Sequence, residues 1–508
     1  MSLNLADCLQ MAADAAPDKT AIIFEEERYT YAELRAAAHR VAHALHASGI
    51  RPGDRVAMML PNTPHFPIIY YGILLAGAVA SPMNVMLRQR EILHRLRDMR
   101  AKAFFVFDLF AGEAALAFDQ APECDHLIVA EADMQPAAPD IGVSFAALMG
   151  QASPDFDMVQ TMPDDDAVIL YASAHDGRMR GARLTHFNLF QNALAIKEYA
   201  LGYYRTDVCV TVLPLFHGFG QTTMMNAPIL AQASVVLLPA FDPAKMFEVI
   251  TRERATILAA VPTMMHFLVH HKRAAEADFS SLRCVITGGA AMPVPLAAQF
   301  TGLFGVPVLE GYGLTETSPV VCWNPDAERN RPGSIGLPIW GVRMRIMRED
   351  GTFAGPGEEG EIVIRGHNVM KGYLNLPEVN QEVFRHGWFH TGDLGRTDED
   401  GYFYFTGLKK DMINRAGMNV YPREVENVLL EHPAIREAAV VGIPDPVRGE
   451  EVMACVVLEP DMTVTSREVI EFCRERIAAY KAPRKVEFLD AMPKNVHGKP
   501  DKKQLRKK

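Results

Sequence analysis

The sequence predicts an α/β protein, with a large N-terminal domain of helix-covered, largely parallel sheets, a small β-rich subdomain and a small α+β C-terminal domain. Up to about Trp340, apolar β-branched runs alternate with helical stretches, which is typical of parallel sheets with helices on both faces. Polar and apolar residues then alternate around Asp350-Gly351 and Asp400-Gly401, which indicates hairpins. The length of 508 residues exceeds what one compact core accommodates.

Residues 1–50 are expected to form two amphipathic helices around a short hairpin, AIIFEEERYTYAEL. Strand-like runs with helical stretches between them follow in the order RVAMML, AFFVFD, HLIVAE, AVILYA, CVTVLPLF, SVVLLP, TILAAVP, RCVITGG and VPVLEGYG. In parallel sheets, ligands bind at the carboxyl ends of the strands. Several of the polar motifs described below lie at such ends.

A new unit begins with LKKDMINRAGMNVYPREVE. Pro422 suits the first position of a helix, AAVVGI and MACVVLE are expected strands, and Thr465 with Glu468 forms a capping box for a second helix. We therefore expect two domains, residues 1–409 and residues 410–508.

Composition narrows the function classes. The net charge of −11 disfavours nucleic acid as the main partner, since phosphate binding needs a basic face. Seven scattered cysteines without a C-x-x-C pair favour reduced thiols over disulfides or zinc. The apolar stretch from Phe66 to Met83 is interrupted by Pro and Gly, so we expect a core helix and strand rather than a membrane span. With no leader at the N-terminus, the expected location is the cytoplasm.

The stretch VPVLEGYGLTETSP (306–319) is the most informative motif. A buried strand is expected to end near Leu309, and glycines on both sides of Tyr312 allow a sharp turn and close approach of a ligand. Thr315 and Glu316 then offer a hydroxyl for phosphate and a carboxylate for Mg²⁺, which prefers oxygen ligands. Taken alone, a polar turn that caps a core strand is the more common explanation.

Four other stretches carry candidate residues, each with a plain structural alternative. Asp393 in WFHTGDLG suits ribose binding or an Asx-turn, and His217 in LPLFHGFG suits a site or a structural role. Lys499 in the basic tail is either a ligand contact or a solvated lysine. Gly417 in RAGMNVYP leaves room for a chain to pass along the backbone.

Six motifs in this order resemble the adenylate-forming superfamily, in its acyl-CoA synthetase branch: LPLFHGFG, GGAAMP (288–293), EGYGLTETSP, WFHTGDLG, KKDMINRAGMNVYPREVE and NVHGKPDKKQLRK. The resemblance spans nearly the whole chain. It implies a mobile C-terminal domain and two steps that use ATP, Mg²⁺ and CoA. ATP and a carboxylic acid give an acyl-adenylate and pyrophosphate, and the thiol of CoA then displaces AMP.

The resemblance also implies roles for individual residues. Thr315, Glu316, His217 and Lys499 would be catalytic, with Glu316 as the metal ligand and Lys499 stabilising charge on the acyl carboxylate and α-phosphate. The nucleotide would contact Ser173, Gly177, Arg180, Gly289, Ala290, Glu310, Gly311, Tyr312 and Asp393. The acyl pocket would use His217, Gly218, Val261, Thr263 and Met264. Lys410 takes the hinge position and Gly417 borders the route of CoA.

Two departures from the family pattern predict weakened use of ATP. The phosphate loop, usually close to Y-T-S-G-T-T-G-x-P-K-G, is YASAHDGRMRG here, with substitutions at Ala174, His175, Asp176, Met179 and Arg180. A carboxylate such as Asp176 about 4 Å from a phosphate charge costs roughly 4 kcal/mol. Leu408 replaces an arginine that contacts ribose, and one charged hydrogen bond is worth roughly 1.5–3 kcal/mol. A loop that binds through its backbone amides would tolerate these changes.

Three functions remain open. The leading one is an AMP-forming acyl-CoA ligase for a fatty or aryl acid, because amino-acid-activating relatives usually carry an aspartate where this chain has His217. The second is an adenylating enzyme that loads a carrier protein, and the third is a homologue with impaired ligase activity. Expected partners are small molecules, without nucleic acid or a membrane span. The length of the acyl chain stays open, as does the oligomeric state, for which a homodimer is one option.

Overall fold

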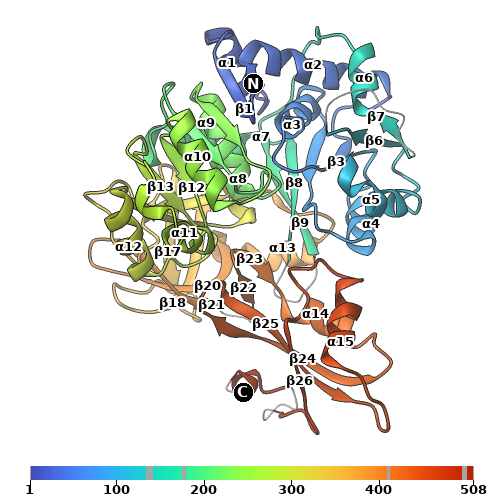
Figure 1. Ribbon diagram of the computed structural model, residues 1–508, viewed down its shortest axis with the longest axis vertical. Coiled ribbons are helices and arrows are strands. Elements are labelled where there is room, and N and C mark those ends of the chain that lie inside the picture. Colours follow the sequence, from blue (N-terminus) through green and yellow to red (C-terminus); the bar gives the residue numbers. More distant parts are fainter. Residues whose placement is uncertain (1, 133–140, 174–178, 409–411, 495–499, 507–508) are drawn as a thin grey trace.

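The structure is a computed structural model that describes residues 2–132, 141–173, 179–408, 412–494 and 500–506, with the backbone alone at Ser173, Leu408 and Lys503. The chain forms a large N-terminal part and a smaller C-terminal part (Figure 1). The helices of this described part are α1 (Asp7–Ala15), α2 (Tyr31–Ala47), α3 (His65–Leu75), α4 (Gln89–Asp98), α5 (Ala111–Phe118), α6 (Phe145–Gln151), α7 (His186–Ala195), α8 (Gly218–Gln221), α9 (Ala227–Leu230), α10 (Pro243–Glu253), α11 (Pro262–Val269), α12 (Val294–Phe304), α13 (Pro377–Val383), α14 (Pro422–Leu429), α15 (Ser466–Arg474) and α16 (Lys502–Leu505).

The first sheet runs from the phosphate-loop strands to the outer edge of the N-terminal part. Its order is β19 (Gly372–Tyr373), β9 (Met179–Thr185), β8 (Asp166–Ser173), β4 (Val79–Pro82), β3 (Arg55–Met59), β5 (Ala103–Phe107), β6 (His126–Ala130) and β7 (Val143–Ser144). The pairs from β8 through β4 and β3 to β7 are parallel. Only β8–β9 and β9–β19, at one edge of these described strands, are antiparallel.

The second sheet carries the central motif on one of its inner strands. Its order is β16 (Leu337–Pro338), β15 (Val320–Trp323), β14 (Val308–Gly313), β13 (Cys284–Thr287), β12 (Ile257–Ala259), β10 (Val208–Thr211), β11 (Ser234–Leu237), β1 (Thr20–Phe24) and β2 (Glu27–Thr30). The pairs from β14 to β1 are parallel, whereas β2, β15 and β16 pair antiparallel at the edges. The predicted α/β architecture with largely parallel sheets is confirmed.

Two antiparallel sheets follow. The subdomain has the order β17 (Val342–Met347), β18 (Gly360–Gly366), β20 (Phe389–Thr397) and β21 (Phe403–Leu408). The C-terminal part has the order β23 (Met418–Val420), β22 (Ile413–Arg415), β25 (Gly449–Leu458) and β24 (Ile435–Asp445), with β26 (Lys485–Phe488) paired to β25. Both predicted Asp-Gly turns form, since Gly351 N–H donates to Arg348 O and Gly401 N–H donates to Asp398 O.

The C-terminal helices begin as predicted. Pro422 is the first residue of α14, and Thr465 and Glu468 form the capping box of α15. The expected boundary between residues 409 and 410 lies outside the described residues, so it stays a prediction.

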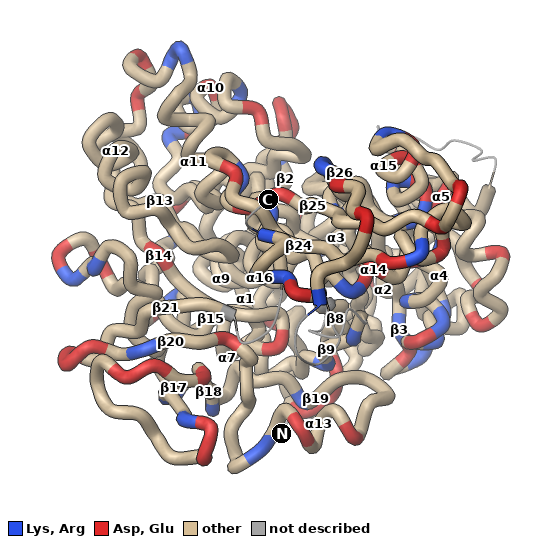
Figure 2. The backbone as a smooth tube through the Cα atoms, turned by 90° about the horizontal axis from the view of Figure 1, so that it is seen from below, with Lys and Arg blue, Asp and Glu red and all other residues tan. Residues whose placement is uncertain are grey.

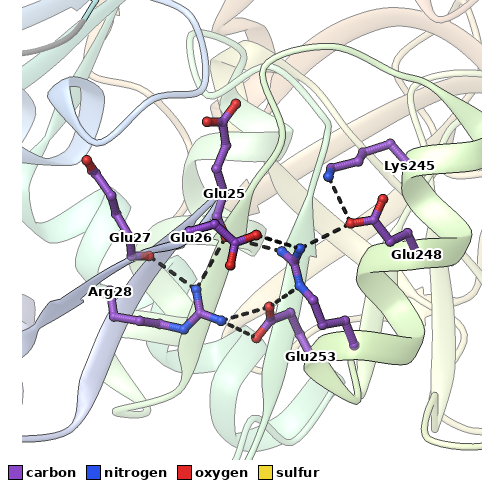
Figure 3. A network of polar contacts seen from close by, with 8 residues as sticks. Glu25, Glu26, Glu27, Arg28, Lys245, Glu248 and Glu253 are labelled. Carbon is purple, nitrogen blue, oxygen red and sulfur yellow. Dashed lines mark hydrogen bonds and ion pairs between the residues drawn. The ribbon is translucent and has the colours of Figure 1, made fainter.

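The N-terminal hairpin is not a separate unit, because β1 is inserted into the second sheet with Ile22 opposite Val235. A surface network of carboxylates and guanidinium groups holds the hairpin against α10 (Figure 3). Arg28 bonds Glu253 at 2.9 Å, and Arg252 bonds Glu26 at 3.1 Å. Exposed pairs of this kind contribute about 0–1 kcal/mol each, so burial of the strand holds the hairpin more than its charges do.

The long apolar stretch forms a core helix and strand, as predicted. Every residue of α3 is buried, and β4 follows it within the first sheet. Within the described ranges, no helix has the length and apolar character needed to cross a bilayer.

A buried ion cluster joins the two parts of the chain. Lys481 is 1% exposed, and its Nζ lies 2.6 Å from Glu91 Oε1 of α4 and 2.7 Å from Glu424 Oε1 of α14. The backbone N–H of Ala478 donates to Glu91 Oε2. Burial alone would raise the pKa of Glu91, but the nearby charges of Lys481 and Arg95 outweigh it and lower that pKa.

An outer pair lies close to this cluster. Arg90 bonds Glu431 of the C-terminal part at 2.6 Å in a solvent-exposed position. Acidic and basic residues are interspersed over the described backbone (Figure 2). The buried cluster and this outer pair thus both join α4 to the C-terminal part.

We predict that Lys481→Met destabilises the protein, because it leaves two carboxylates buried without their cation. Removing one partner of a buried pair costs about 3–5 kcal/mol, measured as the free energy of unfolding in urea. The matched control is Lys485→Met on exposed β26, which should stay within about 0.5 kcal/mol of wild type. Equal stability of the two variants would contradict the cluster's role.

Candidate active site

The central motif lies where β14 leaves the second sheet. Glu310 is buried and accepts the backbone N–H of Met292 at 3.0 Å, and burial raises the pKa of this carboxyl to about 7. A Cβ at Gly311 would lie 2.1 Å from the ring of Trp323, and one at Gly313 would lie 1.9 Å from Pro319 O. Both glycines are therefore required by close packing around the strand end.

Tyr312 links this strand to the subdomain. Its Oη donates to Asp393 Oδ2 at 2.6 Å, and Asp393 lies buried on β20. Burial raises the pKa of Asp393 to about 7, and the hydrogen bond from Tyr312 opposes the rise. The structure thus brings together two residues that the sequence places 81 positions apart.

Glu316 follows in a short 3-10 helix, η5 (Thr315–Thr317). Tyr373 Oη donates to Glu316 Oε1 at 2.7 Å, and the guanidinium of Arg180 lies 5.5 Å from the centre of the Tyr373 ring. Loss of hydration raises the pKa of Glu316, and the charge of Arg180 acts in the opposite direction. Glu316, Tyr373 and Arg180 therefore form one polar cluster, and Thr315 precedes Glu316 in the same short helix.

His217 is the capping residue directly before α8. Its Nδ1 accepts the backbone N–H of Phe219, and a Cβ at Gly218 would lie 3.4 Å from Pro319. The His217 side chain is exposed, yet the surrounding protein desolvates it and lowers its pKa. The contact of Gly218 with Pro319 places His217 beside the segment that carries Glu316.

The C-terminal part covers one side of this region through the β22–β23 hairpin. Asn414 Nδ2 donates to Gly289 O at 2.7 Å. Gly417 has φ +84°, and a Cβ there would lie 3.1 Å from Val261 Cγ1. Gly417, Val261 and Gly289 thus meet at the domain boundary, with Ala290 next to Gly289 in sequence.

The expected acyl-pocket residues divide into two groups. Val261 and Thr263 contact the C-terminal part, since Thr263 Oγ1 donates to Val447 O at 3.1 Å. Met264 packs against the cores of both sides of the second sheet, and Gly218 lies beside Pro319. Thr263 is therefore a domain-interface residue in this orientation.

Some predicted positions lie outside the described residues: Ala174, His175, Asp176, Gly177, Lys410 and Lys499. Ser173 is described as backbone only, and it pairs with Met179 across β8 and β9. Leu408 is likewise described as backbone only, directly opposite Asp393 across β20 and β21. The position where the family has an arginine is thus next to the proposed ribose ligand.

Two tyrosines of the site were missed in the sequence. Tyr373 follows a glycine in a short edge strand, where no pattern marks it. Tyr421 precedes Pro422, and its pKa is raised first by burial and then by the charges of Glu316 and Asp393. The only sequence signal was an aromatic residue beside a glycine or proline.

The residues of the candidate site suit a metal ion that is bound jointly by the protein and by the phosphates of a ligand. Among the described residues, no group of three or more His, Cys, Asp or Glu side chains could hold a metal alone. Mg²⁺ is usually bound by one or two carboxylates together with substrate phosphates. A single desolvated carboxylate at Glu316 agrees with that mode.

Comparisons with known proteins cover nearly the whole chain. Residues 9–374 match the AMP-binding enzyme family, and residues 424–499 match the AMP-binding enzyme C-terminal domain. A long-chain-fatty-acid–CoA ligase of Bacillus subtilis (strain 168) is 36% identical, over 98% of this chain and 93% of the relative. A feruloyl-CoA synthase of Amycolatopsis sp is also 36% identical, over 98% of this chain and 97% of the relative.

A solved structure agrees over the same length. A double mutant of o-succinylbenzoate CoA synthetase from Bacillus subtilis, bound with its product analogue OSB-NCoA, has a TM-score of 0.87 at 30% identity, covering 99% of this chain and 98% of that one. The chain belongs to the AMP-binding enzyme family, in the acyl-CoA ligase branch of the adenylate-forming superfamily.

Proposed function

We propose that the protein is an AMP-forming acid–thiol ligase that activates a fatty or aryl acid. ATP and the acid give an acyl-adenylate and pyrophosphate, and the thiol of CoA then displaces AMP to give acyl-CoA. The observation that carries this proposal is that the Tyr312–Asp393 pair, the Tyr373–Glu316 pair and the segment after His217 all lie beside the residues that follow β14.

In the first step, Asp393 would accept the ribose hydroxyls, and the segment around Gly289 and Gly311 would flank adenine. Thr315 would contact phosphate. Mg²⁺, when bound with Glu316 as its protein ligand, would neutralise phosphate charge. Lys499 would stabilise the charge that develops on the reacting oxygens.

For the second step, the domain orientation supports CoA as the acceptor. The β22–β23 hairpin brings Gly417 against Val261 and Gly289, where the resemblance implies the route of CoA and a side chain would crowd Val261. A relative bound with an acyl-CoA product analogue has the same overall arrangement. A carrier protein that delivers its thiol along the same route is the alternative.

His217 and the named relatives support the proposed substrate class. His217 would offer a neutral imidazole to the acyl group, since loss of hydration lowers its pKa. A neutral group suits an acid without a free amine. The relatives named for long-chain fatty acids and for ferulate support the same two classes.

We predict that fatty or aryl acids, with ATP and Mg²⁺, lead to equal release of pyrophosphate and AMP when CoA is present. Without CoA, pyrophosphate release should fall to a single turnover and AMP should stay on the enzyme, because the acyl-adenylate remains bound. Coupled assays of both products across a panel of acids measure this, with amino acids as the matched negative substrates. Release of pyrophosphate and AMP with amino acids, but not with fatty or aryl acids, would contradict the proposed substrate class.

We predict that Asp176→Thr combined with Leu408→Arg raises the kcat/KM for ATP at least tenfold. The pair removes a repulsion of roughly 4 kcal/mol and adds a charged hydrogen bond. ATP–pyrophosphate exchange measures the effect, and Asp157→Thr, at an exposed position, is the control. No gain over that control would mean that the loop binds through its backbone amides.

We predict that adenosine binds more tightly as the pH rises from about 6 to 8. Burial raises the pKa of Asp393 to about 7, and only the ionised carboxylate accepts both ribose hydroxyls. Calorimetry with adenosine, which lacks titrating phosphates, measures the change. Asp393→Asn should abolish the pH dependence, whereas Glu310→Gln should retain it, although the pKa of Glu310 is also raised to about 7. A dependence that persists in Asp393→Asn would exclude Asp393 as its source.

A further inference from the structure

Residues 370–373 bind both the side chain and the backbone carbonyl of Glu316. Tyr373 Oη donates to Glu316 Oε1 at 2.7 Å, and the backbone N–H of Met370 donates to Glu316 O at 2.9 Å. The terminal torsion of a glutamate has only a broad preference. The hydrogen bond from Tyr373 therefore sets the orientation of the Glu316 carboxylate.

Tyr373 itself is fixed by a neighbouring amide. Its backbone N–H donates to Asn380 Oδ1 at 2.7 Å, and its carbonyl accepts Asn380 Nδ2 at 3.0 Å. Gly372 has φ +142°, and a Cβ there would lie 3.0 Å from Asn380 Nδ2. Close packing thus reserves this position for glycine, and the backbone of Tyr373 has a single anchored position.

The same tyrosine is tied to the strand that leaves the phosphate loop. Tyr373 pairs with Ala182 across β19 and β9, and Leu374 N–H donates to Gly181 O at 2.8 Å. Arg180, on that strand, lies over the Tyr373 ring at 5.5 Å. The ring therefore has a structural role that phenylalanine could fill, whereas the hydroxyl serves Glu316.

We propose that Tyr373 is a positioning residue whose hydroxyl aims the Glu316 carboxylate, and that this sets the Mg²⁺ concentration needed for ATP binding. The inference rests on the proposed function, in which Glu316 is the metal ligand. Mg²⁺ requires near-ideal octahedral geometry, so a carboxylate that is free to turn binds it less well. A hydrogen bond to a charged group is worth about tenfold or more in affinity.

The test is Tyr373→Phe in the full-length protein, which retains the ring under Arg180. Calorimetry of ATP binding at increasing Mg²⁺ should show a midpoint raised about tenfold, with adenosine affinity and thermal unfolding unchanged. The control is Tyr404→Phe, which removes a tyrosine–carboxylate bond of 3.0 Å to Asp398, in the turn region between β20 and β21. It should leave the midpoint unchanged.

A double-mutant cycle with Glu316→Gln identifies the route of the effect. In the Glu316→Gln background, Tyr373→Phe should not shift the Mg²⁺ midpoint further, because the carboxylate that it aims is absent. An unchanged midpoint in Tyr373→Phe would overturn the proposal, as would an equal loss of adenosine affinity, which indicates a merely structural role. If the wild-type protein binds adenosine but shows no Mg²⁺-dependent ATP binding, the proposed function fails, and the inference fails with it.

Discussion

The candidate active site depends on keeping three carboxylates out of bulk water where three sheets meet. Loss of hydration raises the pKa of Glu310, Glu316 and Asp393. Within the described ranges, these carboxylates accept hydrogen bonds from Met292 N–H, Tyr373 Oη and Tyr312 Oη, respectively. Burying a carboxylate away from water costs free energy, so this region favours an incoming cation or hydroxyl donor. The proposed Mg²⁺–nucleotide would supply both.

At the domain interface, in contrast, the acidic side chains are paired directly with a cation. Lys481 lies between Glu91 and Glu424, and both carboxylates contact its Nζ directly. Burial alone would lower the pKa of Lys481, but the acidic groups around it outweigh burial and raise that pKa. A buried lysine thus binds the carboxylates between the two parts of the chain, whereas tyrosine hydroxyls and a backbone N–H bind those of the candidate site. This contrast separates the stabilising cluster from the functional one.

Local patterns were enough to predict much of the fold. Apolar runs predicted the parallel strands, Asp-Gly pairs predicted the tight turns, and Pro422 and Thr465 predicted two helix starts. The insertion of β1 beside β11 was not predictable, because it joins segments more than 200 residues apart. Likewise, Lys481 has the sequence context of an ordinary surface lysine, and only the fold buries it.

The candidate site was predictable as far as its motifs extend. Asp393, Glu316 and His217 were expected from their motifs and the family resemblance, whereas Tyr373 belongs to no recognised pattern and is defined by its partner.

The most direct test of the account is calorimetry with a non-hydrolysable acyl-adenylate, an acylsulfamate of adenosine, compared with AMP. The account predicts that the analogue binds at least about a hundredfold more tightly, as expected for a site complementary to the activated state. Equal affinity for the two ligands, or none for either, would contradict it.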